Sequence, residues 1–336
     1  MIFLKIILIF LTFSPESLFS KQGSGIVLVY HRFDEQKHPS TSISSQNFNE
    51  QLQYLKKNNY NVLPVSRLIE FFYYGYDLPP KSVFITIDDA FKSFYENAFP
   101  LLKNYNFPFS VFLSTGFVNK NRTSDFMDWN MLDELKKNKG EIYNHSDKHK
   151  SFIEYTSTDL IKDIETAEKK IEKNLGKSHK IISYPYGESN TFVRDIVKGL
   201  GYKIAFSQHS SPLHFKENKY NLPRFSINDK YGSLERFAQI INTRPMNISF
   251  VEIKNDEKNN SFQINLKTEF NLNKINCFIN SGNLEKSIND NVLVVKVSNA
   301  SENQRYRLNC TLLKNSDVYW FGTMIIKHKN KFYFQK

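Results

Sequence analysis

Two adjacent carboxylates, Asp88 and Asp89, follow an apolar, β-branched run at positions 83–87, and two histidines spaced four apart, His145 and His149, come later. Consecutive side chains of a strand point to opposite faces, so both carboxylates reach one site only if the strand ends before them. At the C-terminal mouth of a parallel barrel, one carboxylate can bind a cation while its neighbour moves a proton. Two imidazoles four residues apart can reach the same ion. One carboxylate and two histidines leave coordination positions open for water, which indicates a catalytic metal site.

A third motif follows the apolar pair at 181–182, where another strand of the same barrel would end, and reads Ser183-Tyr184-Pro185-Tyr186-Gly187. Each motif alone has an ordinary structural interpretation, because an Asp pair commonly caps a helix or forms a turn. Their order, and the apolar strands before them, favour one shared site.

These motifs resemble those of the polysaccharide deacetylases with a NodB-like domain, carbohydrate esterase family four, over about residues 26–242. The family's Thr-Phe-Asp-Asp motif stands here as Thr86-Ile87-Asp88-Asp89. The resemblance implies that Asp88 is the catalytic base and that Asp89 binds the metal ion.

Two further motifs of the family have counterparts. The first stands as His145-Ser146-Asp147-Lys148-His149, and the resemblance implies that its two histidines are the other metal ligands. The second stands as Pro185-Tyr186-Gly187, which in the family lines the groove. By resemblance, the backbone N–H of Tyr186 binds the oxyanion.

Three more segments resemble the branch of the family that deacetylates poly-N-acetylglucosamine. They are Tyr30-His31-Arg32-Phe33, Trp129 and Leu222-Pro223-Arg224. The resemblance implies an N-acetylated glycan polymer as the substrate, contacted by Pro185, Trp129 and Arg224.

The chain departs from the family pattern at two positions beside the motifs. Ala90 replaces the glycine that usually follows the Asp pair, which constrains the backbone if φ is positive there. Ser183 stands where many relatives carry an arginine that pairs with the base. Arg224 could replace that arginine, or it could form an ordinary ion pair at the barrel end.

The general acid has no clear counterpart, because the late Leu-x-His motif of many relatives is missing near His209 and His214. By resemblance to the poly-N-acetylglucosamine branch, His31 lies close to the site and is the candidate acid. The alternative is that His31 is an ordinary histidine at a strand end whose side chain forms a hydrogen bond to the backbone.

The implied chemistry is hydrolysis of an acetamide, in which a metal lowers the pKa of water towards ~7 and polarises the carbonyl. Zinc suits two histidines and one aspartate, and the same ligands would also accept cobalt, nickel or iron. The products would be acetate and a free glucosamine amine.

Strands alternate with helices from residue 24 to 244, which predicts an α/β fold: a distorted barrel of about seven parallel strands. From 245 to 336 alternating strands continue without helical stretches, which predicts a small antiparallel β-sandwich domain. The only cysteines, Cys277 and Cys310, lie in this second part. In an exported protein they would form a disulfide, with buried free thiols as the alternative.

The N-terminus has one lysine, an apolar stretch and a small residue at Ser20, so residues 1–20 read as a secretory signal peptide. This predicts export to the periplasm or the medium. The stretch is shorter than the ~20 apolar residues that a spanning helix needs, so no transmembrane span is expected. The sequence gives no oligomeric state.

A net charge of +11 is compatible with nucleic acid, an anionic envelope or an acidic polymer. Lysines are scattered among asparagines and no groove-reading motif is present, so no nucleic-acid partner is expected. A compositional bias and a basic groove for anionic glycans both remain open.

Two other classes of function compete with the deacetylase. One is a glycan-binding protein that keeps the fold without turnover, which Ala90 and the missing arginine suggest. The other is a glycoside hydrolase, but that needs two acids on opposite sides of a glycosidic bond, and Asp88 and Asp89 are adjacent.

Overall fold

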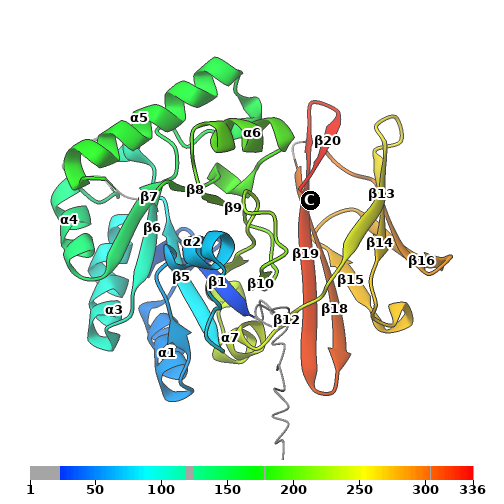
Figure 1. The fold of residues 1–336 in the computed structure, drawn as a ribbon, viewed down its shortest axis with the longest axis horizontal. Helices are drawn as coiled ribbons and strands as arrows, with labels where there is room; N and C mark the ends of the chain where they lie inside the picture. The colour runs from blue at the N-terminus through cyan, green and yellow to red at the C-terminus, as the bar shows by residue number, and fades with distance from the viewer. Residues whose placement is uncertain (1–22, 119–124, 178, 303, 336) are drawn as a thin grey trace, which may run out of the picture.

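The structure is a computed structural model that describes residues 23–118, 125–177, 179–302 and 304–335. Within this part of the chain, a curled, mostly parallel sheet is wrapped by helices and is followed by two antiparallel sheets (Figure 1). The expected signal peptide, residues 1–20, lies outside the described residues. None of the described helices is both long and apolar enough to cross a membrane.

The main sheet runs in the order β10-β1-β5-β6-β7-β8-β9, with β11 beside β1 and β4 beside β5. The pairings of β1 with β5 and of each neighbouring pair from β5 to β9 are parallel, and only β10 is antiparallel. The predicted distorted barrel of about seven strands is therefore confirmed. The strands are β1 (Ser24–Tyr30), β4 (Asn61–Val62), β5 (Ser82–Asp88), β6 (Phe109–Leu113), β7 (Gly140–Asn144), β8 (Ile181–Ser183), β9 (Ile204–Phe206), β10 (Leu213–His214) and β11 (Phe225–Ser226).

Helices cover the outside of this sheet (Figure 1). The helix α5 shows why: Thr156 accepts a hydrogen bond from the N–H of Asp159 at its start, and apolar residues recur on one buried face, as in Leu160, Ile164 and Ile171. The helices are α1 (Ser45–Lys57), α2 (Arg67–Ile69), α3 (Phe99–Tyr105), α4 (Trp129–Lys137), α5 (Ser157–Leu175), α6 (Thr191–Gly199) and α7 (Leu234–Ile241).

A short segment closes the barrel between its two edges. Leu222 forms a parallel bridge with Phe206 of β9, and three residues later Phe225 pairs with Leu28 of β1. Arg224 lies between these two contacts and is fully buried. The closing segment therefore carries an arginine into the barrel.

The C-terminal part forms one sheet in the order β12-β19-β18-β15, with β20 beside β19, and a second in the order β13-β14-β17-β16. Figure 1 shows β18 and β19 on the side of the barrel, with β13, β14 and β16 beyond them. Both sheets contribute to one apolar core, which confirms the predicted antiparallel sandwich. Its strands are β12 (Arg244–Pro245), β13 (Ser249–Asp256), β14 (Ser261–Lys267), β15 (Asn276–Ile279), β16 (Asn283–Asn289), β17 (Val292–Ser298), β18 (Gln304–Lys314), β19 (Asp317–His328) and β20 (Lys331–Phe334).

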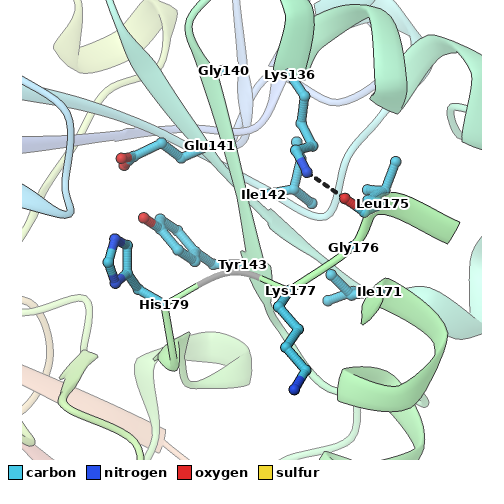
Figure 2. Close-up of a pocket in the computed structure, with 10 residues that line it drawn as sticks. All are labelled: Lys136, Gly140, Glu141, Ile142, Tyr143, Ile171, Leu175, Gly176, Lys177 and His179. Carbon is cyan, nitrogen blue, oxygen red and sulfur yellow. Dashed lines mark hydrogen bonds between the residues drawn. The ribbon is translucent and has the colours of Figure 1, made fainter. Parts of the chain in front are cut away.

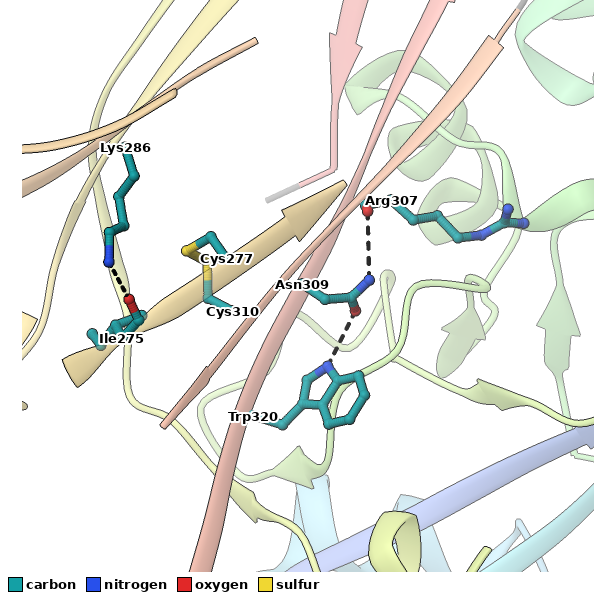
Figure 3. Close-up of a disulfide and its surroundings, with 7 residues drawn as sticks. All are labelled: Ile275, Cys277, Lys286, Arg307, Asn309, Cys310 and Trp320. Carbon is teal, nitrogen blue, oxygen red and sulfur yellow. Dashed lines mark hydrogen bonds between the residues drawn. A yellow bond between two sulfur atoms is a disulfide. The ribbon is translucent and has the colours of Figure 1, made fainter. Parts of the chain in front are cut away.

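The two cysteines face each other on neighbouring strands of this sandwich. Cys277 of β15 and Cys310 of β18 are in register and form a disulfide, which Figure 3 shows. The bond closes a sequence separation of 33 residues, which restricts the unfolded chain.

The sandwich packs directly on the barrel. The ring centroid of Trp320 lies 5.3 Å from that of Phe225 in the closing segment. The side chain of Gln335 donates a hydrogen bond to the carbonyl of Gly187 at 2.7 Å and accepts one from Ser207 Oγ at 2.7 Å. The last described residue thus contacts the Pro-Tyr-Gly turn.

Candidate active site

The Asp pair sits where β5 ends and the backbone turns sharply. The strand includes Asp88, so the predicted end at residue 87 is wrong by one position. Asp89 and Ala90 then adopt left-handed conformations, with φ of 69° and 64°. This turn breaks the strand alternation and lets adjacent carboxylates approach one site. For Ala90 the left-handed conformation costs roughly 1–2 kcal/mol, which the glycine of relatives would avoid.

The histidine motif forms a tight loop after β7. The Asn144 side chain accepts a hydrogen bond from the Ser146 N–H at 2.8 Å, and Ser146 Oγ accepts one from the His149 N–H at 2.8 Å. Asp163 of α5 accepts two more, from the N–H groups of residues 147 and 148. These bonds fix the backbone of the loop from which both imidazoles project.

Asp89, His145 and His149 come together as the sequence motifs predicted. Each offers one ligand atom, and these three atoms lie within 4.8 Å of one another. Asp89 Oδ1 lies 2.9 Å from His149 Nε2 and 3.4 Å from His145 Nε2. Their positions after the parallel strands β5 and β7 bring two distant parts of the sequence to one end of the barrel.

The hydrogen bonds of this trio fit a bound cation. His145 Nδ1 lies 2.8 Å from the carbonyl oxygen and 2.6 Å from the hydroxyl oxygen of Ser183, and the carbonyl, which can only accept, favours a hydrogen on Nδ1. In the neutral ring Nε2 then presents a lone pair to Asp89. Asp89 Oδ1 is buried and has no hydrogen-bond partner among the described residues. Lone pairs that face each other in a buried space are stabilised by a shared positive charge, which a divalent metal supplies.

The pKa of Asp89 reflects the same arrangement. Burial opposes ionisation of this carboxyl, yet the imidazoles of His145 and His149, when they carry a proton on the nitrogen that faces it, hold its pKa well below the ordinary value. Asp89 is therefore an anion near neutral pH and is available as a ligand.

Asp88 is fully buried and is paired with Arg224. The guanidinium donates two parallel hydrogen bonds, from Nη1 to Oδ1 and from Nη2 to Oδ2, both 2.7 Å long. Burial opposes ionisation of Asp88, and Arg224 overcomes it, so that the pKa of the carboxyl is lowered. Asp88 Oδ2 also lies 3.8 Å from His145 Nε2. The arginine thus stands behind the carboxylate and away from the solvent, where it keeps Asp88 charged.

The Pro-Tyr-Gly turn lies beside the histidines. Tyr186 has a left-handed φ of 60°, and its ring centroid lies 4.7 Å from that of His149. Gly187 has φ of 72°, and a Cβ there would lie 2.4 Å from the backbone nitrogen of Gln208. Only glycine fits this contact, so the turn is tied to the segment after β9.

His31 follows β1 and lines the same cavity as Asp89 and His149. Burial lowers the pKa of its imidazole, while the charges of Asp88 and Asp89 oppose that shift. His31 is therefore mainly neutral near neutral pH and must gain a proton before it can deliver one.

Two named proteins are similar to this chain in amino-acid sequence. The chain is 31% identical over 243 residues to a poly-beta-1,6-N-acetyl-D-glucosamine N-deacetylase of Staphylococcus aureus (strain MSSA476), an alignment that covers 64% of this chain and 83% of the relative. The enzyme of the same name from Staphylococcus epidermidis is 27% identical over 246 residues, with 64% and 83% covered. A family model described as polysaccharide deacetylase matches residues 75–205.

The chain belongs to the polysaccharide deacetylase family. Solved structures agree on its fold: the Streptococcus pyogenes deacetylase PplD in complex with acetate has a TM-score of 0.60 at 20% identity, covering 65% of this chain and 98% of its own. IcaB from Ammonifex degensii has a TM-score of 0.59 at 21% identity, covering 66% and 98%.

In this deacetylase the site opens into a cavity of about 710 Å³. Asp89, His149, His31 and Tyr186 line it, whereas Pro185, Trp129 and Arg224 do not. Trp129 begins α4 and packs against the barrel core. The substrate contacts expected of these last three residues are therefore not supported by their positions in this structure.

Sequence reasoning missed two contributions to the cavity. Gln208 lines it and donates a hydrogen bond to Asp88 Oδ2 at 3.3 Å. It lies two residues after the end of β9, so the rule that strand ends carry the site could have found it. The sandwich domain supplies the second contribution, including Arg305 and Arg307, for which the barrel motifs gave no signal.

Another pocket of the deacetylase, of about 330 Å³, lies at the start of β7 and not at its end (Figure 2). Gly140 of β7 and Leu175 of α5 line it, and Lys136 donates a hydrogen bond to the Leu175 carbonyl there. It lies far along the strand from His145 and has no part in the metal trio.

Proposed function

We propose that this deacetylase removes N-acetyl groups from an N-acetylglucosamine-containing polysaccharide by metal-dependent hydrolysis and releases acetate. The observation that carries the proposal is the trio of Asp89, His145 and His149 beside a buried carboxylate, Asp88, that Arg224 keeps ionised. The names of the staphylococcal relatives make poly-β-1,6-N-acetylglucosamine the first polymer to test.

Asp89, His145 and His149 would hold one divalent ion. Zinc suits these ligands best, and cobalt, nickel or iron would also be accepted. When bound, the metal lowers the pKa of water and polarises the acetamide carbonyl.

Asp88 acts as the base that takes a proton from the attacking water. An ionised, hydrogen-bonded carboxylate is suited to that task, and Arg224 and Gln208 fix its direction. The backbone N–H of Tyr186 stabilises the negative charge that develops on the former carbonyl oxygen.

The departing amine needs a proton, and His31 is the residue assigned to deliver it. A neutral imidazole in the same cavity as the ionised carboxylates can first take up a proton from solvent and then release it to the amine, while Asp88 returns the proton of the attacking water to solvent.

We also propose that the protein is exported and consists of a signal peptide and two domains. Residues 1–20 act as a signal peptide, residues 24–244 form the deacetylase domain, and residues 245–336 form the sandwich domain. A disulfide within the sandwich is consistent with export, since oxidising compartments preserve such bonds.

The test is acetate release from poly-β-1,6-N-acetylglucosamine and from chitin oligomers by the mature protein, with chelator and with added zinc, cobalt or nickel. We expect release that the chelator abolishes and metal restores. Bound metal without acetate from any polymer would favour a glycan-binding protein instead.

Two neighbouring variants separate the roles of the carboxylates. We expect Asp88→Asn to keep its metal and lose roughly 100-fold or more in kcat, because only the base is removed. We expect Asp89→Asn to lose metal as measured by elemental analysis. Equal metal loss in both variants would overturn the division of roles.

A further inference from the structure

The active-site cavity has a second wall that the barrel does not supply. Phe278 of β15 and Arg305 and Arg307 of β18 line it opposite the barrel loops. Residues 305 and 307 lie on one face of β18, because side chains alternate along a strand, and Tyr306 between them is buried in the sandwich core. Figure 3 shows the side chain of Arg307 reaching from this strand away from the disulfide.

Three arginines from both domains converge on this cavity. Arg236 of α7 joins Arg305 and Arg307 among the lining residues. Two of them lie over tyrosine rings of the cavity: the Arg236 guanidinium lies 5.1 Å from the ring centre of Tyr231, and that of Arg305 lies 5.2 Å from the ring centre of Tyr186. Since Tyr186 contacts His149, this positive group lies at the edge of the metal trio.

These arginines are poorly neutralised by the protein. Arg236 Nε is buried without a hydrogen-bond partner in the described part of the chain. No described carboxylate lies within ion-pair distance of Arg307, and Arg305 reaches Glu188 only at 3.6 Å. Among the described residues that line the cavity, Asp89 is the one carboxylate, and the histidines already engage it.

Grouping like charges in a partly desolvated space is unfavourable unless an anion joins them. Burial lowers the pKa of Arg307 and the charge of Arg305 lowers it further, while the charge of Glu188 opposes this shift without cancelling it. A guanidinium matches carboxylate and phosphate oxygens with paired N–H groups. The arrangement therefore fits an oxyanion better than an empty or neutral cavity.

The aromatic side chains of the cavity point to a glycan as the carrier of that anion. Phe278, Tyr231 and Tyr186 remain 60%, 43% and 39% exposed, and all three line the cavity. Flat apolar faces beside polar groups are typical of ligand sites that combine contact area with orientation.

We propose that Arg236, Arg305 and Arg307 form an anion subsite, which binds a carboxylate or phosphate group on the same glycan whose acetamide is hydrolysed. The inference rests on the proposed function and narrows its substrate class: the preferred polymer is N-acetylated and negatively charged. The sandwich domain thereby determines specificity for the barrel's reaction.

The test uses two oligomers that differ only in charge. A partly de-N-acetylated β-1,6-glucosamine oligomer is succinylated on its free amines, and half of the product is converted to the methyl ester. We expect a KM for the carboxylate form about tenfold below that for the ester, as a charge-assisted hydrogen bond provides. We also expect the ratio to fall as salt rises from 0.05 to 0.5 M.

Variants of the arginines test whether they cause the difference in KM between the two oligomers. We expect Arg307→Gln to reduce the charge preference severalfold, Arg307→Lys to restore part of it, and Arg236→Gln with Arg307→Gln to bring the KM ratio near one. Lys314→Gln removes the same charge from the same strand outside the cavity and should leave the ratio unchanged. A wild-type ratio near one, or a preference that survives in the double variant, overturns the proposal.

Binding measurements test the anion subsite independently of the proposed deacetylase reaction. Calorimetry with the Asp88→Asn variant compares the two oligomers without turnover. If neither oligomer yields acetate but the carboxylate form binds more tightly, the proposed reaction fails and the subsite stands. Glucuronate and glucose 6-phosphate as competitors then show whether the subsite prefers carboxylate or phosphate.

Discussion

At the scale of single residues, the deacetylase site uses two adjacent aspartates for opposite purposes. Asp88 faces a buried guanidinium, and Asp89 faces the Nε2 atoms of two imidazoles. The same side chain thus becomes a base or a ligand according to its neighbours. The left-handed turn at Asp89 makes this division geometrically feasible.

The pair between Arg224 and Asp88 leads to a prediction on the pH dependence of turnover. Arg224 lowers the pKa of Asp88, and a base must be ionised, so a weaker partner raises that pKa. We expect Arg224→Lys to move the acidic limb of the kcat/KM profile up by about one pH unit.

The control for this measurement is Arg244→Lys, which alters an exposed ion pair with Asp317 at the edge of the sandwich. Its acidic limb should match that of the wild type. An unshifted limb in the Arg224 variant would mean that another group sets the limb.

Residue types and their positions after apolar strands were enough to predict the metal trio, because carboxylates and histidines are ordinary metal ligands and the strand ends bring them together. The use of Ser183 could not be predicted in this way. It stands where relatives carry an arginine, yet its carbonyl orients the ring of His145, and any residue type has a carbonyl. The roles of Asp89, His145 and His149 as ligands stay predictions until metal is measured.

At the scale of elements, the turn at 185–187 depends on one glycine. Gly187 has a positive φ and lies against the backbone of Gln208. A side chain there must displace either the turn or the segment after β9, and both line the site.

We expect Gly187→Ala to destabilise the fold by a few kcal/mol and to lower kcat, because the methyl group would lie 2.6 Å from Gln208 Cβ in a strained backbone. Thermal melting and acetate release measure the two effects. Gly199→Ala, in α6 with no atom within 4 Å of its new Cβ, should instead raise stability slightly. Equal behaviour of the two variants would contradict the role assigned to the turn.

The hydrophobic pattern of the sequence predicted the alternating strands and helices of the barrel. It did not predict the segment that closes the barrel. Helix α5 runs from Ser157 to Leu175, where apolar residues recur with a long and regular helical period. The closing segment instead uses a single bridge at Leu222 and a two-residue strand, β11. Pairing this short leaves no periodic signal in a sequence.

At the scale of the whole molecule, barrel and sandwich share one cavity. The motifs of the family lie in the barrel, so sequence comparison draws attention to only one of its walls. The position of the second domain depends on contacts between residues far apart in the chain, such as Phe225 with Trp320, which no local pattern encodes.

Global stability should depend on a buried histidine outside the catalytic group. Burial lowers the pKa of His209 to about 4, below its ordinary 6.5. Between these values the unfolded chain binds the proton and the folded chain does not, so stability is complete above pH 6.5 and falls towards pH 4. We expect this group to contribute about 3 kcal/mol of that loss.

Urea denaturation at several pH values measures the effect. His209→Asn should flatten the dependence between pH 6.5 and 4, whereas His38→Asn, at an exposed position, should not. An unchanged slope in the His209 variant would assign the acid sensitivity to other groups.

The contact of Gln335 with Gly187 ties the sandwich to the turn beside the metal trio. The Gln335 side chain donates to the Gly187 carbonyl and accepts from the Ser207 hydroxyl, so one amide holds both the turn and the segment after β9. A barrel produced without the sandwich would leave these two buried groups without their partner. The deacetylase barrel is therefore not a self-sufficient module, and studies of its reaction need both domains.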